Sequence, residues 1–238
     1  MADFDFEQFK KELLDGVGNA ADAVSGAAKE TGGDIVRFKQ FNETGRDLFA
    51  SGAVTSHGGN LSVSDGSFIW VSRTAAMLGH LTPNDIVRVD WEPSPLDANA
   101  SMELVVHRAM YRAFAECAAQ ANAGAGAPFG VRAIIHAHTK HTVFRSLVED
   151  FITPLDSEGR LLLGKSVPVL SPKKTVASEE VAALMAQHVS AGIPVAVIRG
   201  HGPFAWADSL ENAFRLISCL EYSAELLTLF EMTGRKPK

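Results

Sequence analysis

The hydrophobic and polar positions of the chain follow two spacings, one typical of helices and one typical of strands. Apolar residues three or four positions apart predict helices over about residues 36–51, 103–121, 179–191 and 209–230. Short apolar runs bounded by turn residues predict strands near residues 61–63, 68–71, 86–89, 133–138 and 193–198. This mixed order predicts an α/β fold, a three-layer α/β/α single domain.

The first 33 residues carry a helical pattern of their own. Apolar residues recur at helical spacing from Leu13 to Ala27, and the pattern stops at Gly32 and Gly33. We expect residues 1–33 to form an N-terminal helical appendage that packs on the core or on another subunit. Residues 34–238 then form the main domain.

Length, charge and cysteine content narrow the class of protein. A chain of 238 residues with 46% hydrophobic residues can bury one large core. The net charge of −6 argues against a general nucleic-acid binder. The two cysteines, Cys117 and Cys219, lie in helical patterns and predict reduced thiols. With no signal segment and no run of membrane-spanning length, we expect a cytoplasmic protein with no membrane partner and no nucleic-acid partner.

Two histidines stand two positions apart in a predicted buried strand. His136 and His138 then point to the same face of a sheet, because side chains alternate along a strand. A single histidine is more often a satisfied polar residue than a ligand, but a pair on one face is half of a transition-metal site. Zinc is the commonest ion for such ligands when one coordination position stays open for chemistry.

Two residues are candidates to complete this site. His201 lies between two glycines at the end of a predicted strand, where it would face a cleft. Glu103 lies at the start of a predicted helix and could be either a metal ligand or a proton carrier. His107, one turn later, could orient Glu103, or it could be solvated or pack in the helix. His141 is out of phase with the pair and is interpreted as cleft lining.

Four short blocks, in this order and spacing, resemble the class II aldolase/adducin family. They cover residues 58–63, 101–107, 135–138 and 200–206, the last followed by 212–225, and the resemblance extends over about residues 34–233. The family includes fuculose-phosphate aldolases, ribulose-phosphate 4-epimerases, decarboxylases and dehydratases. It implies a mainly antiparallel central sheet, a catalytic domain over residues 34–238 and a homotetramer with sites near subunit interfaces.

The resemblance also implies residue roles. His136, His138 and His201 would hold a divalent metal, usually zinc, and Glu103 would be the catalytic acid or base, as in the aldolases; the epimerases usually have aspartate there. The implied reaction is that of a metal-dependent lyase, which breaks or forms a carbon–carbon bond beside a carbonyl of a small sugar or sugar phosphate through a metal-stabilised enediolate. The alternatives are an epimerase, a decarboxylase, a dehydratase or a non-catalytic adducin-like interaction domain.

The family's sugar-phosphate pocket matches this chain incompletely. By motif match, the expected substrate-binding residues are Gly59, Asn60, Ser72, Arg73, Thr74 and Ser101. Ala75 stands where the family has a glycine that lets an anion approach the backbone, and Met102 stands in place of a serine. Arg73 could supply charge to a phosphate or carboxylate instead, or be an ordinary surface arginine.

One family residue has no counterpart here. The aldolases draw a tyrosine from a neighbouring subunit to protonate the departing fragment, but no tyrosine falls within residues 151–159. Asp156 or Glu158 could replace it as the acid, although an ordinary polar loop is the commoner explanation. This departure weakens the expectation of cleavage of a fuculose-like phosphate.

Overall fold

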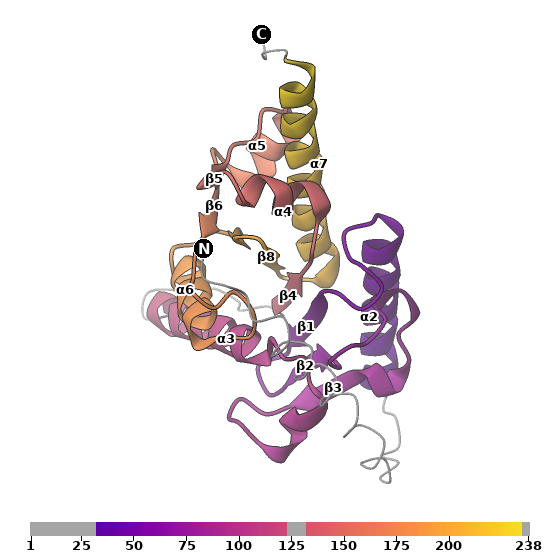
Figure 1. The fold of residues 1–238 in the computed structure, drawn as a ribbon. Coiled ribbons are helices and arrows are strands. Elements are labelled where there is room, and N and C mark those ends of the chain that lie inside the picture. The colour runs from indigo at the N-terminus through magenta and orange to yellow at the C-terminus, as the bar shows by residue number, and fades with distance from the viewer. Residues whose placement is uncertain (1–31, 123–131, 235–238) are drawn as a thin grey trace.

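A computed structural model of the chain describes residues 32–122 and 132–234 (Figure 1). The helix expected between Leu13 and Ala27 and most of the Ala/Gly-rich loop after residue 122 lie outside the described residues. The boundary between an appendage and a main domain near residue 33 therefore stays a prediction.

An eight-stranded sheet forms the middle layer of the described part of the chain, in the order β3-β2-β1-β4-β8-β7-β6-β5. The strands are β1 (Asn60–Ser64), β2 (Ile69–Ser72), β3 (Ile86–Val89), β4 (Arg132–His136), β5 (Phe151–Ile152), β6 (Val167–Leu170), β7 (Val195–Ile198) and β8 (Gly202–Ala207). Neighbouring strands are antiparallel except β6 and β7, which are parallel. The mainly antiparallel sheet expected from the family resemblance is confirmed.

Helices cover both faces of this sheet. They are α2 (Gly32–Ala50), α3 (Leu104–Asn122), α4 (Lys140–Ser146), α5 (Ser157–Leu163), α6 (Glu179–Ser190) and α7 (Leu210–Thr233). Figure 1 shows α3 and α6 on one side of the strands and α2 and α7 on the other. The side chains of successive β4 residues pack on opposite faces of the sheet, since Ile134 packs with α3 and α6 while Ile135 packs with α2 and α7. The α/β three-layer fold is therefore confirmed.

Three features near the site differ from the sequence expectation. Strand β4 ends at His136, so His138 lies in the loop before α4 and not in the strand. Residues 202–207 form β8, although Gly202 and Pro203 are turn residues by type; the carbonyl of Pro203 accepts a hydrogen bond from Ala137 N at 3.1 Å. The seven-residue helices α4 and α5 are too short to produce a helical period in the sequence.

Two predicted helix starts are confirmed by their caps. The side chain of Ser178 accepts a hydrogen bond from Val181 N at the start of α6, and that of Ser209 accepts one from Asn212 N at the start of α7.

Within the described residues, none of the helices is both long and apolar enough to cross a membrane.

Candidate metal centre

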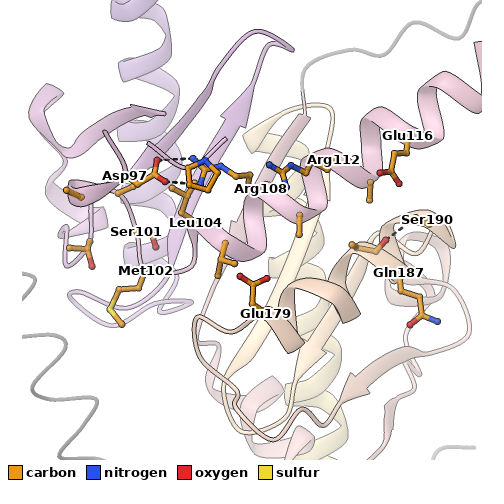
Figure 2. Close-up of a pocket in the computed structure, with 18 residues that line it drawn as sticks. Asp97, Ser101, Met102, Leu104, Arg108, Arg112, Glu116, Glu179, Gln187 and Ser190 are labelled. Atoms are coloured by element: carbon orange, nitrogen blue, oxygen red, sulfur yellow. Dashed lines mark hydrogen bonds and ion pairs between the residues drawn. The ribbon is translucent and has the colours of Figure 1, made fainter. Parts of the chain in front are cut away.

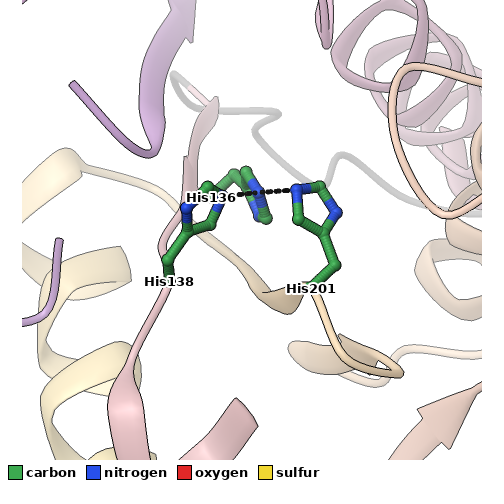
Figure 3. Close-up of side chains that lie close together, drawn as sticks. All are labelled: His136, His138 and His201. Carbon is green, nitrogen blue, oxygen red and sulfur yellow. Dashed lines mark hydrogen bonds between the residues drawn. The ribbon is translucent and has the colours of Figure 1, made fainter. Parts of the chain in front are cut away.

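Three histidines meet where β4 and β8 lie side by side (Figure 3). His136 is the last residue of β4, His138 follows in the loop, and His201 lies in the turn between β7 and β8. His136 Nε2 lies 3.0 Å from His138 Nε2 and 3.2 Å from His201 Nε2. The sheet thus brings together residues that are far apart in sequence, and their ligand atoms all lie within 4.8 Å of one another.

Backbone contacts fix the orientation of the central imidazole. His136 Nδ1 lies 3.0 Å from the carbonyl oxygen of Pro203, so the Nδ1–H donates there and Nε2 is left with a free lone pair. The ring also stacks on Phe204, with centroids 4.1 Å apart. A ligating histidine typically donates its other ring N–H to a backbone carbonyl in this way.

Glycines allow the backbone to come close at this centre. Gly202 has a φ of +151°, and a Cβ there would lie 2.0 Å from the carbonyl oxygen of Ala137. Gly59 has a φ of +79°, and a Cβ there would lie 2.7 Å from the carbonyl oxygen of His136. Any larger residue at either position would push apart the strands that hold the imidazoles.

The three imidazoles are neutral at physiological pH. Burial, with smaller contributions from neighbouring imidazoles, lowers the pKa of His136 well below its ordinary value and that of His201 to about 3. Burial also lowers the pKa of His138. Neutral imidazole is the form that binds a metal, so this set fits a divalent ion with an open coordination position.

Glu103 lies beside the histidines, immediately before α3. Its Oε1 is 3.9 Å from His201 Nε2 and accepts a hydrogen bond from Ala177 N at 3.1 Å. Its Oε2 is buried and has no hydrogen-bond partner among the described residues. Burial raises the pKa of this carboxyl to about 7, against the opposing effect of the Ala177 N–H. A group with that pKa can take up and release a proton near neutral pH.

His107 does not orient Glu103. Its Nε2 lies 2.5 Å from Asn60 Oδ1, and its Nδ1 lies 2.6 Å from Ser62 Oγ. Burial lowers the pKa of this imidazole to about 3, so it is neutral. The sequence left its role open between orienting Glu103, being solvated and packing in the helix, and the first two of these alternatives are wrong.

Comparison with known proteins identifies the family to which the chain belongs. The sequence profile described as Class II Aldolase and Adducin N-terminal domain matches residues 39–228. The chain belongs to the class II aldolase/adducin family. The resemblance found in the sequence blocks is thereby confirmed.

Members of this family that resemble the chain are enzymes. The L-fuculose phosphate aldolase of Methanocaldococcus jannaschii is 26% identical over 83% of this chain and 98% of its own length. A methylthioribulose-1-phosphate dehydratase of Bradyrhizobium sp. is 30% identical over 79% of this chain and 88% of its own. The crystal structure of L-fuculose-1-phosphate aldolase from Thermus thermophilus has a TM-score of 0.72 and 33% identity, covering 84% of this chain and 97% of the other. The chain is an enzyme of the class II aldolase/adducin family.

The residues expected to bind substrate in this family member lie in two places. Gly59 and Asn60 lie beside the histidines, because Asn60 is the register partner of His136 across β1 and β4. Thr74 and Ser101 line a cavity of about 780 Å³ between α3 and α6 (Figure 2). Ser101 Oγ also accepts a hydrogen bond from Glu103 N at 3.2 Å.

Ser72 and Arg73 already have partners within the protein. Ser72 Oγ accepts a hydrogen bond from Leu61 N at 3.1 Å. The Arg73 guanidinium donates to Asp85 Oδ1 from Nε at 3.0 Å and from Nη2 at 2.8 Å. Ala75 has a φ of +54°, the left-handed conformation that the family's glycine would adopt without strain.

Asp156 and Glu158 belong to helix α5. Asp156 is its N-cap and accepts hydrogen bonds from Gly159 N and Ser223 Oγ, each at 2.6 Å. Burial raises the pKa of Asp156, but these hydrogen bonds outweigh it and the net result is a lowered pKa. Such contacts favour capping over proton donation for Asp156, and Glu158 is an exposed residue of the first turn.

Sequence reasoning missed two contributors to the centre. The N–H of Ala177, which has a left-handed φ of +46°, holds Glu103, and the carbonyl of Pro203 holds His136. Both act through main-chain atoms, so residue type gives no signal for them.

Proposed function

We propose that the protein is a metal-dependent lyase that breaks or forms a carbon–carbon bond beside the carbonyl of a small sugar or sugar phosphate. The observation that carries this proposal is the group of three neutral imidazoles with a buried carboxyl, Glu103, beside it. Similarity to fuculose-phosphate aldolases in sequence and in structure supports the same reaction class.

The proposed cofactor is Zn²⁺, held by His136, His138 and His201. Three nitrogen ligands with one position left for substrate is the usual arrangement of catalytic zinc. When bound, the ion would supply Lewis-acid stabilisation of negative charge on the substrate oxygens. The protein contributes the fixed imidazole orientations, through the Pro203 carbonyl and the stack on Phe204.

Glu103 is the proposed acid or base. Its Oε1 is held by Ala177 N, while its Oε2 has no hydrogen bond to the described residues and is free to exchange a proton with substrate. Burial raises the pKa of this carboxyl to about 7 and so favours its protonated form. A carboxyl of this kind can accept a proton in one direction of the reaction and return it in the other.

We assign substrate contacts to Gly59, Asn60, Ser72, Arg73, Thr74 and Ser101, with Asn60 the nearest to the histidines by strand register. The double hydrogen bond of Arg73 to Asp85 leaves its charge partly neutralised. A phosphate or carboxylate would therefore depend mainly on neutral donors of the Gly59–Asn60 turn and of the Thr74 and Ser101 region.

A dehydratase is the second candidate. The 30% identical methylthioribulose-1-phosphate dehydratase supports it, as does the lack of a tyrosine within residues 151–159. Loss of water beside a carbonyl needs the same proton removal by a carboxylate but no acid for a departing carbon fragment. Epimerisation and decarboxylation are further alternatives of the same family.

Product masses separate these reactions. The zinc-loaded protein is incubated with L-fuculose 1-phosphate and, separately, with methylthioribulose 1-phosphate, and the products are analysed by mass spectrometry. Two carbonyl fragments from the fuculose ester support the lyase, whereas one product lighter by a water from the other ester identifies a dehydratase. An isomer of unchanged mass that chromatography separates from the substrate identifies an epimerase. A product mixture identical to that from His136→Ala would contradict catalysis at this centre.

We also propose a homotetramer, in keeping with the family resemblance, and a cytoplasmic location. Exposed apolar side chains on and after α4, on β5 and α5 and in the last turn of α7 support the assembly: Phe144, Leu147, Val148, Phe151, Leu161 and Met232. Figure 1 shows α4, β5, α5 and the end of α7 gathered in one region. Leu161 is 80% exposed and Met232 78%, which is a large unfavourable exposure in a monomer. Light scattering after size exclusion should give the mass of four chains, and the mass of one chain would refute the assembly.

A further inference from the structure

A chain of hydrogen bonds leads from the metal centre into the layer between the sheet and α3. It joins Asn60 Oδ1 to His107 Nε2 at 2.5 Å, His107 Nδ1 to Ser62 Oγ at 2.6 Å, and Ser62 Oγ to Tyr111 Oη at 2.8 Å. All four side chains are buried, and His107 and Ser62 are fully buried. Polar groups so placed must be satisfied by one another, so the direction of each hydrogen bond depends on the next.

The atoms in contact favour one direction along this chain. Asn60 Oδ1 carries no hydrogen and can only accept, so its contact with His107 Nε2 requires a proton on Nε2. The proton of His107 is therefore on Nε2, and Nδ1 accepts from the Ser62 hydroxyl. Because the Ser62 proton goes to His107 Nδ1, Ser62 Oγ accepts from Tyr111, whose single proton is shared between Ser62 Oγ at 2.8 Å and the carbonyl oxygen of Arg132 at 3.2 Å.

This direction decides which end of the Asn60 amide is free. With Oδ1 occupied by His107, Nδ2 remains, and no described residue accepts a hydrogen bond from it. Asn60 is directly opposite His136 in the β1–β4 ladder, so the two side chains extend from the same face of the sheet. The amide donors of Asn60 are then the part of this residue available to a ligand of the histidine cluster.

We propose that His107 is a positioning residue: by donating Nε2–H to Asn60 Oδ1 it holds the Asn60 amide with its two N–H donors available to the substrate. The opposite tautomer would turn the amide and offer a carbonyl oxygen instead. His107 thereby makes the site select an oxygen acceptor, such as a phosphate, hydroxyl or carbonyl oxygen, over a cationic amine group. This substrate preference rests on the proposed function, whereas the hydrogen-bond direction does not.

The tautomer can be measured without any turnover. Nitrogen-15 NMR of the histidine-labelled, zinc-loaded protein distinguishes a protonated from an unprotonated ring nitrogen, and His107→Gln identifies the His107 signals by their loss. We expect Nε2 protonated and Nδ1 unprotonated from pH 6 to pH 8. An Nδ1–H tautomer or a doubly protonated ring would overturn the proposal, whatever reaction the enzyme catalyses.

The consequence for binding is tested with inorganic phosphate as the probe. Calorimetry on zinc-loaded proteins should give affinity about tenfold weaker for His107→Leu and for Asn60→Ala. The double variant should be no weaker than Asn60→Ala alone, because His107 acts through Asn60. His107→Gln, whose amide can donate to Asn60, should bind within about threefold of wild type.

Zinc content and unfolding midpoints of the same variants distinguish a positioning role of His107 from a loss of folded structure. If His107→Leu proves unfolded, the Gln variant and the tautomer still decide the question. Additive losses in the double variant, or phosphate affinity that is independent of Asn60, would overturn the positioning role. Failure to turn over either sugar phosphate would instead count against the proposed function alone.

Discussion

At the scale of single residues, burial is the main determinant of the chemistry. It raises the pKa of Glu103 to about 7 and lowers the pKa of His201 to about 3, so near pH 7 the imidazole is neutral while the carboxyl exchanges between its protonated and ionised forms. Short sequence blocks identified the types of these residues. Their protonation states could not be predicted from the sequence, because they depend on the groups that α3, α6 and the 171–178 loop place around them.

Replacement of Glu103 tests its proposed role in proton transfer. Glu103→Gln keeps the shape and the acceptor for Ala177 N but cannot carry the proton. We expect turnover to fall by about 10²- to 10⁴-fold while zinc content stays at the wild-type level. Steady-state rates beside elemental analysis check this. Full activity in the variant would assign the proton transfer to another group.

His107 should make the protein less stable in acid. Its pKa is lowered from 6.5 to about 3 on folding, so between these values the unfolded state binds more protons and stability falls as the pH falls. The slope for one such group is about 1.4 kcal/mol per pH unit. Urea unfolding at pH 7 and pH 5 should therefore show a larger loss for wild type than for His107→Gln. Equal losses would mean that His107 is protonated without difficulty in the folded state.

The left-handed conformation of Ala75 predicts a stabilising substitution. Ala75→Gly removes the steric cost of a φ of +54°. Glycine also gives the unfolded chain more conformational freedom, which offsets part of this effect, so we expect the free energy of unfolding to rise by up to about 1 kcal/mol. Ala76→Gly is the matched control, because Ala76 is buried and is not among the positive-φ residues. Denaturant unfolding should show a gain for the first and a loss for the second. A loss of similar size in both would contradict the strain at Ala75.

At the scale of elements, the short helix α4 positions His138. Glu221 of α7 accepts hydrogen bonds at the α4 N-terminus from His141 N at 2.8 Å and from Thr142 N at 2.9 Å. The helix begins two residues after His138, so this contact anchors the end of the ligand loop. A carboxylate at a helix N-terminus is favourable both as a cap and toward the helix dipole.

Glu221→Ala should therefore affect both stability and metal retention. We expect a loss of about 1–2 kcal/mol in the free energy of unfolding and faster release of zinc to a chelator. Glu225→Ala, an exposed position one turn further along α7, should change neither. Equal zinc release from the two variants would show that α4 does not hold His138 in place.

The elements also show which structural features could not be predicted from the sequence. Long periodic segments such as α3 and α7 were predicted to within a few residues, because apolar spacing and caps define them. Strand β8 was missed because Gly202 and Pro203 are turn residues by type, yet here pairing with β4 and β7 on both sides imposes an extended backbone. His138 was placed in a strand by alternation alone, which cannot detect where pairing ends.

At the scale of the whole molecule, the sheet order creates the centre. Strands β1, β4 and β8 are neighbours although β8 follows β4 by more than sixty residues in the sequence, and this arrangement aligns Asn60, His136 and Phe204 in register. The mixed pattern of helices and strands predicted three layers. The family resemblance implied only that the sheet is mainly antiparallel, and the strand order came from the structure, since spacing along the chain does not specify which strands pair.

The most direct test of a metal centre at these histidines is the metal content of the purified protein, measured by elemental analysis after incubation with zinc and removal of the excess. We predict about one divalent ion per chain in wild type and in His80→Ala, an exposed histidine outside the centre. We predict loss of that ion in His136→Ala, which removes the imidazole shared by both short contacts. A wild-type protein that retains no metal, or a His136→Ala variant that retains as much as His80→Ala, would contradict the assignment.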